Sequence, residues 1–385
     1  MKPESHGTTP GKNAGIHMKK TAIDLFNSSI LRVFRHAAAM TLRNPTQSAF
    51  FVKTMARQMA AAGRRSRLAG KGVSVPPLMI ASVTRTCNLR CKGCYSMNHD
   101  RPNRPDMPIG RWREILKEAD GLGVSIVMVA GGEPFARPEF IALIREFKRM
   151  IFPVFTNGLL LTDEGIGRLG KPRNLIPVFS LEGGRYATDL RRGRGVFEKV
   201  RETMRKLTDR GAFYGMSFTV TRENFEDLTD AAFIAPLVRD GCRLFFFVEY
   251  IPVEEGTEDL VLTGVQKLEL ERITVGFRSE FAAEFIAFPG DEEQYGGCMA
   301  AGRGFIHVGP DGGLEPCPFA PYSDVNLKRV SLTEALRSPF LAAIRRNHAS
   351  LAETRGGCAL WTNREWVRSL LPVNAESGAA VEAVP

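Results

Sequence analysis

Three cysteines close together in the chain combine reactive side chains with an informative spacing. Cys87, Cys91 and Cys94 form a CxxxCxxC pattern directly after an apolar, strand-like run. Thiolates are the usual protein ligands of iron–sulfur clusters, and three thiolates on four irons leave one iron open to a small molecule. The alternatives are a zinc site without its fourth ligand, or chance. We predict a catalytic 4Fe-4S cluster at these cysteines.

A glycine-rich turn follows the next strand-like run, where residues 131–134 read Gly-Gly-Glu-Pro. Glycines let a backbone approach a ligand closely, although such a turn alone is also a common strand terminator. Together, the cysteine pattern and this turn resemble the radical S-adenosylmethionine (SAM) superfamily, in which CxxxCxxC follows the first strand of a partial (β/α)6 barrel and GGEP ends the second. The resemblance covers residues 76–253.

The resemblance implies the chemistry of an enzyme. In the family, the open iron binds the amino nitrogen and carboxylate of SAM. An electron from the reduced cluster then yields methionine and a 5′-deoxyadenosyl radical, which abstracts hydrogen from a substrate. A reductase, a flavodoxin or a ferredoxin would supply the electron. The substrate itself does not follow from the resemblance.

The resemblance also implies a SAM pocket at the strand ends. The GGEP stretch would bind the SAM amino group, Ser180 and Glu182 would approach the ribose or the SAM carboxylate, and Arg192 would lie near that carboxylate. For Asn157, Thr219 and Thr221, a cap or turn role is an equal alternative. The predicted cofactor-binding residues are Tyr95, Gly131, Gly132, Glu133, Pro134, Asn157, Ser180, Glu182, Arg192 and Thr219.

Two positions depart from the family pattern. The residue before the third cysteine is usually aromatic, but here it is Gly93. We expect Tyr95 to take over part of the packing against adenine. Glu182 replaces the aspartate that the family usually has at the end of the fourth strand.

A second group of cysteines lies towards the C-terminus. The pattern is Cys298, thirteen residues, Gly312, four residues and Cys317, with Cys358 further along the chain. This pattern is similar to the start of SPASM and twitch extensions, which hold auxiliary iron–sulfur clusters. A full SPASM pattern has more cysteines, so the resemblance implies one auxiliary cluster at Cys298, Cys317 and Cys358. Residues 311–313 predict a hairpin turn that returns Cys317 towards Cys298. The alternatives are buried thiols or a zinc site using His307 or His348.

Strand-like and helix-like segments alternate around these motifs, which favours parallel βαβ units. The fold class we predict is α/β, a partial (β/α)6 TIM-type barrel whose ligands gather at the carboxyl ends of the strands. The strand candidates are Leu78 to Val83, Ser125 to Ala130, Phe152 to Thr156, Leu175 to Leu181, Tyr214 to Val220 and Leu244 to Ile251. The helix candidates between them are 110–121, 138–149, 163–169, 196–209 and 225–239. After Pro252 we expect the alternation to stop, with one more helix over 265–283.

The remaining segments complete the domain plan. Apolar residues at helical spacing from Ala22 to Met59 predict two amphipathic helices, interrupted at Asn44-Pro45 and followed by a basic linker over 64–71. We expect a disordered N-terminus over 1–20, a basic helical segment over 21–75, the barrel over 76–255, a SPASM/twitch-like module over 256–370 and a flexible tail over 371–385.

The net charge of +10 lies almost entirely in residues 1–76, which hold thirteen Lys and Arg and two Asp and Glu. Such a localised positive field indicates an anionic partner. If the partner is a membrane surface, a lipid or isoprenoid-like substrate would fit, and if it is an acidic leader, a peptide substrate would fit. The purely structural alternative is that the helices cover the base of the barrel. Seven cysteines without a signal sequence indicate a reduced, cytoplasmic protein. If the basic helices bind a membrane surface, the protein would lie at the inner face of the membrane.

Two hypotheses complete the analysis. Glu249, among the aromatic residues of the sixth strand candidate, could exchange a proton in the barrel cavity. A non-catalytic zinc or iron–sulfur regulator with a basic, nucleic-acid-binding arm is the alternative function. The intact GGEP motif and the barrel pattern favour the enzyme, so nucleic acid is not the partner we expect.

Overall fold

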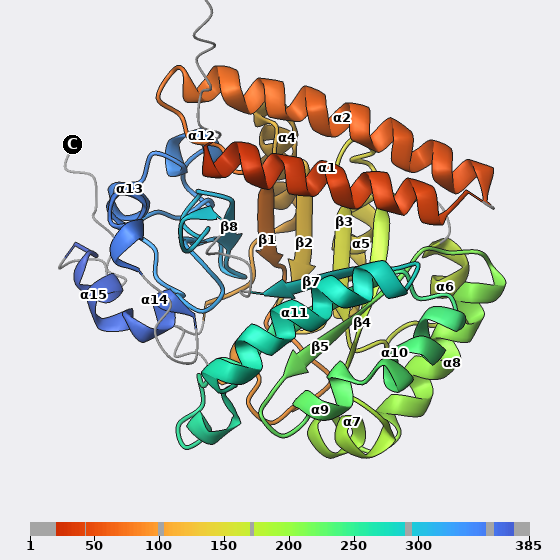
Figure 1. The fold of residues 1–385 in the computed structure, drawn as a ribbon. Coiled ribbons are helices and arrows are strands. Elements are labelled where there is room, and N and C mark those ends of the chain that lie inside the picture. The colour runs from red at the N-terminus through yellow and green to blue at the C-terminus, as the bar shows by residue number, and fades with distance from the viewer. Residues whose placement is uncertain are drawn as a thin grey trace, which may run out of the picture.

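The computed structural model describes residues 21–42, 44–98, 104–169, 173–288, 295–351 and 358–372. The predicted disordered segment 1–20 and the predicted tail from residue 373 onward lie outside the described residues. The described strands form one curled sheet flanked by helices, as Figure 1 shows.

The sheet has nine strands in the order β7-β6-β5-β4-β3-β2-β1-β8-β9. Neighbours from β7 to β8 are parallel, and β9 is antiparallel to β8. The strands are β1 (Leu78–Ser82), β2 (Ile126–Ala130), β3 (Phe152–Thr156), β4 (Leu175–Leu181), β5 (Gly215–Val220), β6 (Leu244–Glu249), β7 (Glu284–Phe288), β8 (Phe305–Val308) and β9 (Leu314–Glu315). The predicted α/β class and partial barrel are confirmed.

The helices follow the strands as the alternating pattern predicted, with local differences. The longer ones are α1 (Ala22–Met40), α2 (Pro45–Ala69), α4 (Ile109–Leu122), α5 (Pro138–Ile144), α6 (Asp163–Leu169), α7 (Arg185–Arg192), α8 (Val196–Asp209), α10 (Ala231–Arg239), α11 (Gly264–Glu280) and α13 (Pro339–Arg346). The shorter ones are α3 (Tyr95–Asn98), α9 (Phe225–Thr229), α12 (Leu332–Ala335), α14 (Ala359–Thr362) and α15 (Arg364–Ser369). The single helix predicted over 225–239 is wrong, because the Asp230 side chain accepts a hydrogen bond from the Ala232 N–H and starts a new helix.

The expectation that the alternation stops after Pro252 is also wrong. Helix α11 begins with a capping box between Thr263 and Gln266, and it leads into β7, which pairs in parallel with β6. At the other edge, β8 pairs in parallel with β1. The sheet is therefore wider than the six strands predicted. The turn predicted at residues 311–313 does join β8 to β9, with Gly312 at φ +93°.

Alternate residues of each strand face opposite sides of the sheet. On the outer side, Phe245 and Phe285 stack at 4.9 Å, and Phe277 of α11 packs on Phe285. On the inner side, Phe155 of β3 contacts Phe246 of β6 at 5.1 Å, although the two strands are not neighbours. The curl of the sheet therefore brings inward-facing rings together across the barrel interior.

Helices α1 and α2 cover the amino ends of the strands (Figure 1). Phe51 of α2 packs on Phe213 just before β5, at 5.0 Å between ring centroids. Gln58 accepts a hydrogen bond of 2.5 Å from Ser125 before β2, and Arg65 donates to the carbonyl oxygen of Gly123 at the end of α4. Burial lowers the pKa of Arg65 to about 10. The predicted basic linker is wrong up to Ala69, because Arg65 is part of the packed face of α2.

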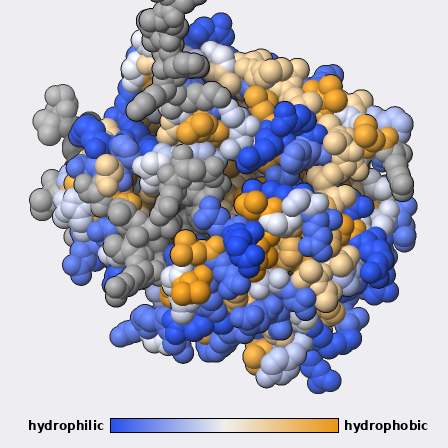
Figure 2. Space-filling model, in the orientation of Figure 1, coloured by the Kyte–Doolittle hydropathy of each residue, from blue (hydrophilic) through white to orange (hydrophobic). Residues whose placement is uncertain are grey.

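The apolar faces that suggested an interfacial anchor are thus used against the barrel. Phe34, Ala37 and Phe51 are buried. In Figure 2, strongly hydrophobic residues on this side of the molecule appear as separate spots among moderately hydrophobic and hydrophilic ones. In the described part of the chain, no helix has the length and apolar content that crossing a membrane requires. The structure therefore matches the purely structural alternative, in which the two helices cover the base of the barrel.

If α2 is part of the barrel core, Phe51→Ala lowers the free energy of unfolding by about 3–5 kcal/mol, the usual result of removing a buried ring. The neighbouring Val52 is 55% exposed, and Val52→Ala serves as the matched control with a change within about 0.5 kcal/mol. Urea denaturation followed by circular dichroism measures both. Equal effects of the two substitutions would contradict this packing.

Candidate active site

The three cysteines lie in the loop between β1 and α3, at the carboxyl end of the sheet. Their thiols are partly buried. The Leu89 N–H donates to the sulfur of Cys87 at 3.4 Å, and the Cys94 N–H donates to the carbonyl of Cys91 at 3.3 Å. Burial raises the pKa of the Cys87 and Cys91 thiols, while Arg192 favours the thiolate at both. The positive charge that would stabilise deprotonated ligands therefore lies beside this loop.

The glycine turn after β2 is bonded to the cysteine loop through the backbone. The Gly132 N–H donates to the Thr84 carbonyl at 2.7 Å, and the Glu133 N–H donates to the Thr86 carbonyl at 2.8 Å. A Cβ on Gly132 would lie 2.2 Å from the Thr86 oxygen, and one on Gly131 would lie 2.6 Å from the Thr84 oxygen. These glycines are required because two loops meet here without space for side chains.

The carboxylate of Glu133 joins the turn to the end of β3. It is buried and accepts hydrogen bonds from the N–H of Phe135 at 3.0 Å, the hydroxyl of Thr156 at 2.8 Å and the N–H of Asn157 at 2.8 Å. Burial raises the pKa of Glu133, and these three hydrogen bonds oppose that rise. Pro134 then starts a short 3-10 helix, Pro134–Ala136.

Asn157 connects the end of β3 to the first cysteine. Its amide nitrogen donates to Asn88 Oδ1 at 2.8 Å and lies 3.9 Å from the Cys87 sulfur. Its side-chain oxygen accepts from the Leu159 N–H at 3.0 Å. The residue therefore combines the predicted location in the pocket with the alternative role as a turn residue.

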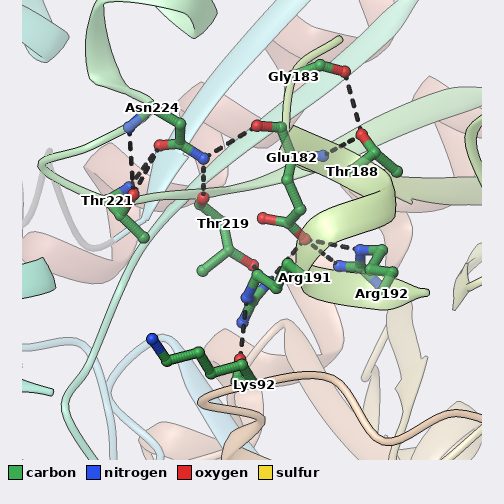
Figure 3. A network of polar contacts seen from close by, with 9 residues as sticks. All are labelled: Lys92, Glu182, Gly183, Thr188, Arg191, Arg192, Thr219, Thr221 and Asn224. Atoms are coloured by element: carbon green, nitrogen blue, oxygen red, sulfur yellow. Dashed lines mark hydrogen bonds and ion pairs between the residues drawn. The ribbon is translucent and has the colours of Figure 1, made fainter. Parts of the chain in front are cut away.

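A buried carboxylate at the end of β4 organises a second network, drawn in Figure 3. Oε1 of Glu182 accepts from Arg191 Nη1 at 2.6 Å and from Arg192 Nε at 2.7 Å. Arg191 also donates to the Thr219 hydroxyl at 2.9 Å and, through Nε, to the Lys92 carbonyl at 3.0 Å. One arginine thus connects β4 and β5 to the cysteine loop between its second and third cysteines.

Sequence reasoning named Arg192 and missed Arg191. The two are adjacent in α7, and neither spacing nor residue type distinguishes them. Only the fold shows that Arg191 reaches Lys92. Asn224 was also missed: its amide donates to the carbonyls of Glu182 and Thr219 at 3.0 Å each, and its Oδ1 accepts from the N–H and hydroxyl of Thr221. Thr221 is therefore a turn residue here.

The electrostatics of this network favour an ionised centre. Burial alone would lower the pKa of Arg192, but Glu182 and then Cys91 outweigh it and raise that pKa. The second carboxylate oxygen of Glu182, Oε2, is buried and has no hydrogen-bond partner in the described structure. A buried acceptor without a donor is costly, so a ligand that donates a hydrogen bond would be stabilised here. Ser180 faces the barrel interior opposite Ser217 of β5.

Gly93, at the position where the family usually has an aromatic residue, lies against an aromatic ring from another part of the chain. Its φ is +66°, and a Cβ there would lie 2.4 Å from the hydroxyl oxygen of Tyr250, just past β6. Glu254 Oε2 accepts the Gly93 N–H at 2.7 Å. The ring of Tyr95 packs against Phe319 at 5.3 Å, and its predicted packing against adenine stays a prediction. The aromatic ring that packs on the cysteine loop beside Gly93 is Tyr250.

Glu249 does not face the barrel cavity. It lies on the outer side of β6, in register with Val220, and its carboxylate is 2.9 Å from Lys267 Nζ of α11. Burial raises the pKa of Glu249, and Lys267 opposes this. The hypothesis that Glu249 exchanges a proton in the cavity is wrong, because Glu249 alternates outward with Phe245 and Phe247.

The C-terminal cysteines are brought together from three segments. Cys298, Cys317 and Cys358 are buried. The pKa of Cys317 is well above its usual value because of burial, a hydrogen bond with Cys358 and the nearby Cys298. The Ala301 N–H donates to the Pro316 carbonyl at 3.1 Å and fixes the first two segments together. Both ring nitrogens of His307, an alternative zinc ligand, already contact Ser82 and Glu315.

The donor types at both cysteine groups are those of iron–sulfur clusters. Among the described residues, no three His, Cys, Asp or Glu side chains converge as one metal ion requires. Zinc needs four donors at about 2.0–2.3 Å from one point, whereas each thiolate of an iron–sulfur cluster binds a different iron. The loop of Cys87, Cys91 and Cys94, the adjacent guanidinium of Arg192 and the unused oxygen of Glu182 fit a 4Fe-4S cluster with SAM beside it.

Comparison with known proteins agrees with this geometry. Residues 81–234 match the family model of the Radical SAM superfamily. The chain carries a radical SAM domain. It is therefore a radical SAM enzyme, and the cofactors of that family are a 4Fe-4S cluster and SAM.

Curated relatives of this radical SAM enzyme extend past the domain. Pre-heme d1 synthase of Dinoroseobacter shibae is 23% identical over 326 residues, covering 74% of this chain and 79% of that protein. Mycofactocin maturase MftC of Mycolicibacterium smegmatis is 27% identical over 316 residues, covering 75% and 79%. The solved structure of Streptococcus suis SuiB bound to S-adenosylmethionine has a TM-score of 0.61 at 18% identity, covering 76% of this chain and 73% of that one. This last likeness shows a shared fold.

The contact between Gly93 and Tyr250 predicts the result of three variants. Gly93→Ala places a Cβ against the ring, so we expect loss of iron and SAM binding weakened about tenfold, equivalent to about 1.4 kcal/mol. Adding Tyr250→Phe gives little relief, because two ring carbons still lie 2.8 and 2.9 Å away. Adding Tyr250→Ala removes the ring and restores part of the iron content, because an alanine at the positive φ of this position stays strained. Iron analysis and SAM titration of anaerobically purified protein measure these effects, and full iron content in Gly93→Ala alone would reject the contact.

The network around Glu182 predicts a large loss of stability when its charge is removed. Glu182→Gln leaves two partly buried guanidinium groups without their carboxylate, which costs about 3–5 kcal/mol. The matched control is Glu198→Gln, because Glu198 pairs with Arg185 where both side chains are exposed, and such pairs contribute about 0–1 kcal/mol. Urea denaturation measures both, and a loss below 1 kcal/mol for Glu182→Gln would contradict the network.

Proposed function

We propose that this radical SAM enzyme modifies a peptide with the help of one auxiliary iron–sulfur cluster. The observation that carries the proposal is the convergence of Cys298, Cys317 and Cys358, all buried, on the barrel that holds the SAM site. When bound, the first cluster and SAM supply a carbon-centred radical that abstracts hydrogen. The auxiliary cluster, held in the C-terminal part of the predicted module 256–370, would take up electrons during the modification.

The comparisons support a peptide or a tetrapyrrole as the substrate. One solved structure of SuiB is bound to the precursor peptide SuiA, and it covers 77% of this chain at a TM-score of 0.58. Fe-coproporphyrin III synthase of Methanosarcina barkeri is 28% identical over 156 residues, which is 40% of this chain. These relatives leave both substrate classes open, and the residues on the inner face of the barrel distinguish between them.

The inner face of the barrel favours a peptide. Tetrapyrroles of the haem type carry several carboxylates, whose burial requires cations. In the strands that the structure describes, no Lys or Arg is present, and the titratable inward-facing residues are Glu284, His307 and Glu315. Apolar inward-facing residues such as Phe155, Val248 and Phe288 dominate the opposite wall.

The residues of the site would act by holding and shielding the reacting groups. Glu182, Arg191 and Arg192 fix the cysteine loop and leave one oxygen of Glu182 for a donor on SAM. The apolar inner wall excludes water from the reacting carbon. The proposed residues for SAM are those predicted from the sequence, with Arg191 added and Tyr250 in the place given to Tyr95.

A lipid substrate and membrane contact are not part of the proposal, because the apolar faces of α1 and α2 pack on the barrel. The electron donor is proposed to be a reductase, a flavodoxin or a ferredoxin. A regulator with a nucleic-acid-binding arm has no supporting observation beyond the local charge.

Two triple variants test the proposal against one control. Replacing Cys87, Cys91 and Cys94 by Ala removes the first cluster, so we expect about four irons per chain instead of about eight and no 5′-deoxyadenosine from SAM under dithionite. Replacing Cys298, Cys317 and Cys358 by Ala also leaves about four irons, but cleavage of SAM persists. Cys242→Ala, at a buried cysteine distant from both groups in sequence, keeps all the iron.

The substrate class is tested in cells. Peptide mass spectra of cells with the intact chain should contain modified peptides that are absent with either triple variant. If the two sets of cells differ in tetrapyrroles and not in peptides, the peptide assignment is wrong. Unchanged iron in the C-terminal triple variant would reject the auxiliary cluster.

A further inference from the structure

A serine, a histidine and a glutamate form a continuous chain of contacts that is separate from the network around Glu182. Ser82 Oγ is 2.8 Å from His307 Nε2, and His307 Nδ1 is 2.7 Å from Glu315 Oε2. All three residues are buried, and His307 is fully so. They come from β1, β8 and β9. Strand β1 is far from the other two in the sequence, but the three strands are adjacent in the sheet.

The strand register places this chain of contacts on the inner face. Ile80 pairs with Met128 and with His307, and His307 pairs with Glu315. Following the same face across the sheet leads to Phe246, whose ring meets Phe155 inside the barrel. Ser82 is the last residue of β1 and lies five positions before Cys87 in the chain. Its hydroxyl is therefore on the inner wall beneath the cysteine loop.

The donors and acceptors of the triad have one consistent arrangement. An ionised carboxylate only accepts hydrogen bonds, so Glu315 holds the proton on His307 Nδ1. In the neutral imidazole, Nε2 is then the acceptor of the Ser82 hydroxyl. A histidine oriented in this way by a carboxylate is a base that can take a proton through a bonded hydroxyl group.

The position of His307 can be compared with that of the other titratable residues on the inner face of the described strands. Of the titratable inward-facing residues in the described strands, Glu284 is at the start of β7 and contacts His36 of α1 at 3.1 Å, at the opposite end of the barrel. Glu133 and Glu182 lie outside the strands, where Glu133 accepts hydrogen bonds that hold the loops and Glu182 pairs with Arg191 and Arg192. Within the described strands, His307 is therefore the base of the inner face that lies beneath the cysteine loop.

We propose that Ser82, His307 and Glu315 form a proton relay for the substrate of this enzyme, a role that rests on the proposed peptide modification. An N–H, O–H or activated C–H group of the bound peptide gives its proton to Ser82 Oγ, while the hydroxyl proton moves to His307 Nε2. The bonding electrons stay on the substrate, and the imidazolium is stabilised by the Glu315 carboxylate. The transfer consumes no further reactant.

The first test compares product formation with cleavage of SAM. In cells, His307→Gln reduces the modified peptides roughly 10²-fold or more, the usual contribution of a general base. Purified His307→Gln still forms 5′-deoxyadenosine without substrate, within a factor of about two of the unaltered enzyme, because that step needs no relay. Ser82→Ala lowers the product similarly, and Ser82→Thr, which keeps a hydroxyl, retains it. His36→Gln, which removes the other histidine–glutamate contact, is the matched control with unchanged product. Unchanged product in His307→Gln overturns the proposal.

The second test needs no substrate. Nitrogen-15 spectra of histidine-labelled protein, with His307→Gln for assignment, should show His307 neutral with its proton on Nδ1, and Glu315→Gln should shift the proton between the nitrogens. A proton on Nε2, or a permanent imidazolium, overturns the relay. If cells with the intact chain and with the Cys87, Cys91 and Cys94 variant contain the same peptides, the proposed function fails, and the spectra still decide whether His307 is a competent base.

Discussion

The site depends on how a loop without regular structure is held at the edge of the sheet. The loop of Cys87, Cys91 and Cys94 has few hydrogen bonds of its own, and its neighbours supply the rest. The glycine turn after β2 bonds its first half through the backbone, and Arg191 and Glu254 bond its second half. Such support keeps three thiols in fixed positions, which a cluster with one open iron requires.

The supports also explain the charge around the loop. Thiolate ligands place negative charge in a partly buried site, and burial alone opposes it, as the raised pKa of Cys91 shows. Arg191 and Arg192 provide the opposite charge, and Glu182 keeps both guanidinium groups in place. The same carboxylate leaves one oxygen without a partner. The carboxylate that supports the loop is therefore also the acceptor that we propose for a donor on SAM.

The two faces of the barrel sheet differ in the side chains that they carry. The outer face buries aromatic side chains under the helices, and the inner face combines apolar residues with the chain of Ser82, His307 and Glu315. Helices α1 and α2 cover the amino ends of the strands, and the cysteine loop lies at their carboxyl ends. The basic charge of the first 76 residues is partly used in this cover, where Arg65 binds the end of α4.

The sequence by itself determined the cysteine site, the glycine turn, the α/β class and the first six strands, because these depend on local spacing and on the alternation of apolar residues. Only the tertiary structure decided that Arg191, next to the predicted Arg192, connects β4 and β5 to the cysteine loop. It also decided that Tyr250 packs beside Gly93 and that Glu249 faces outward. It also decided that His307 meets Ser82, a residue 225 positions away. These pairs are set by strand register and by the curl of the sheet, which are properties of the packed chain and leave no periodic signal in the residues themselves.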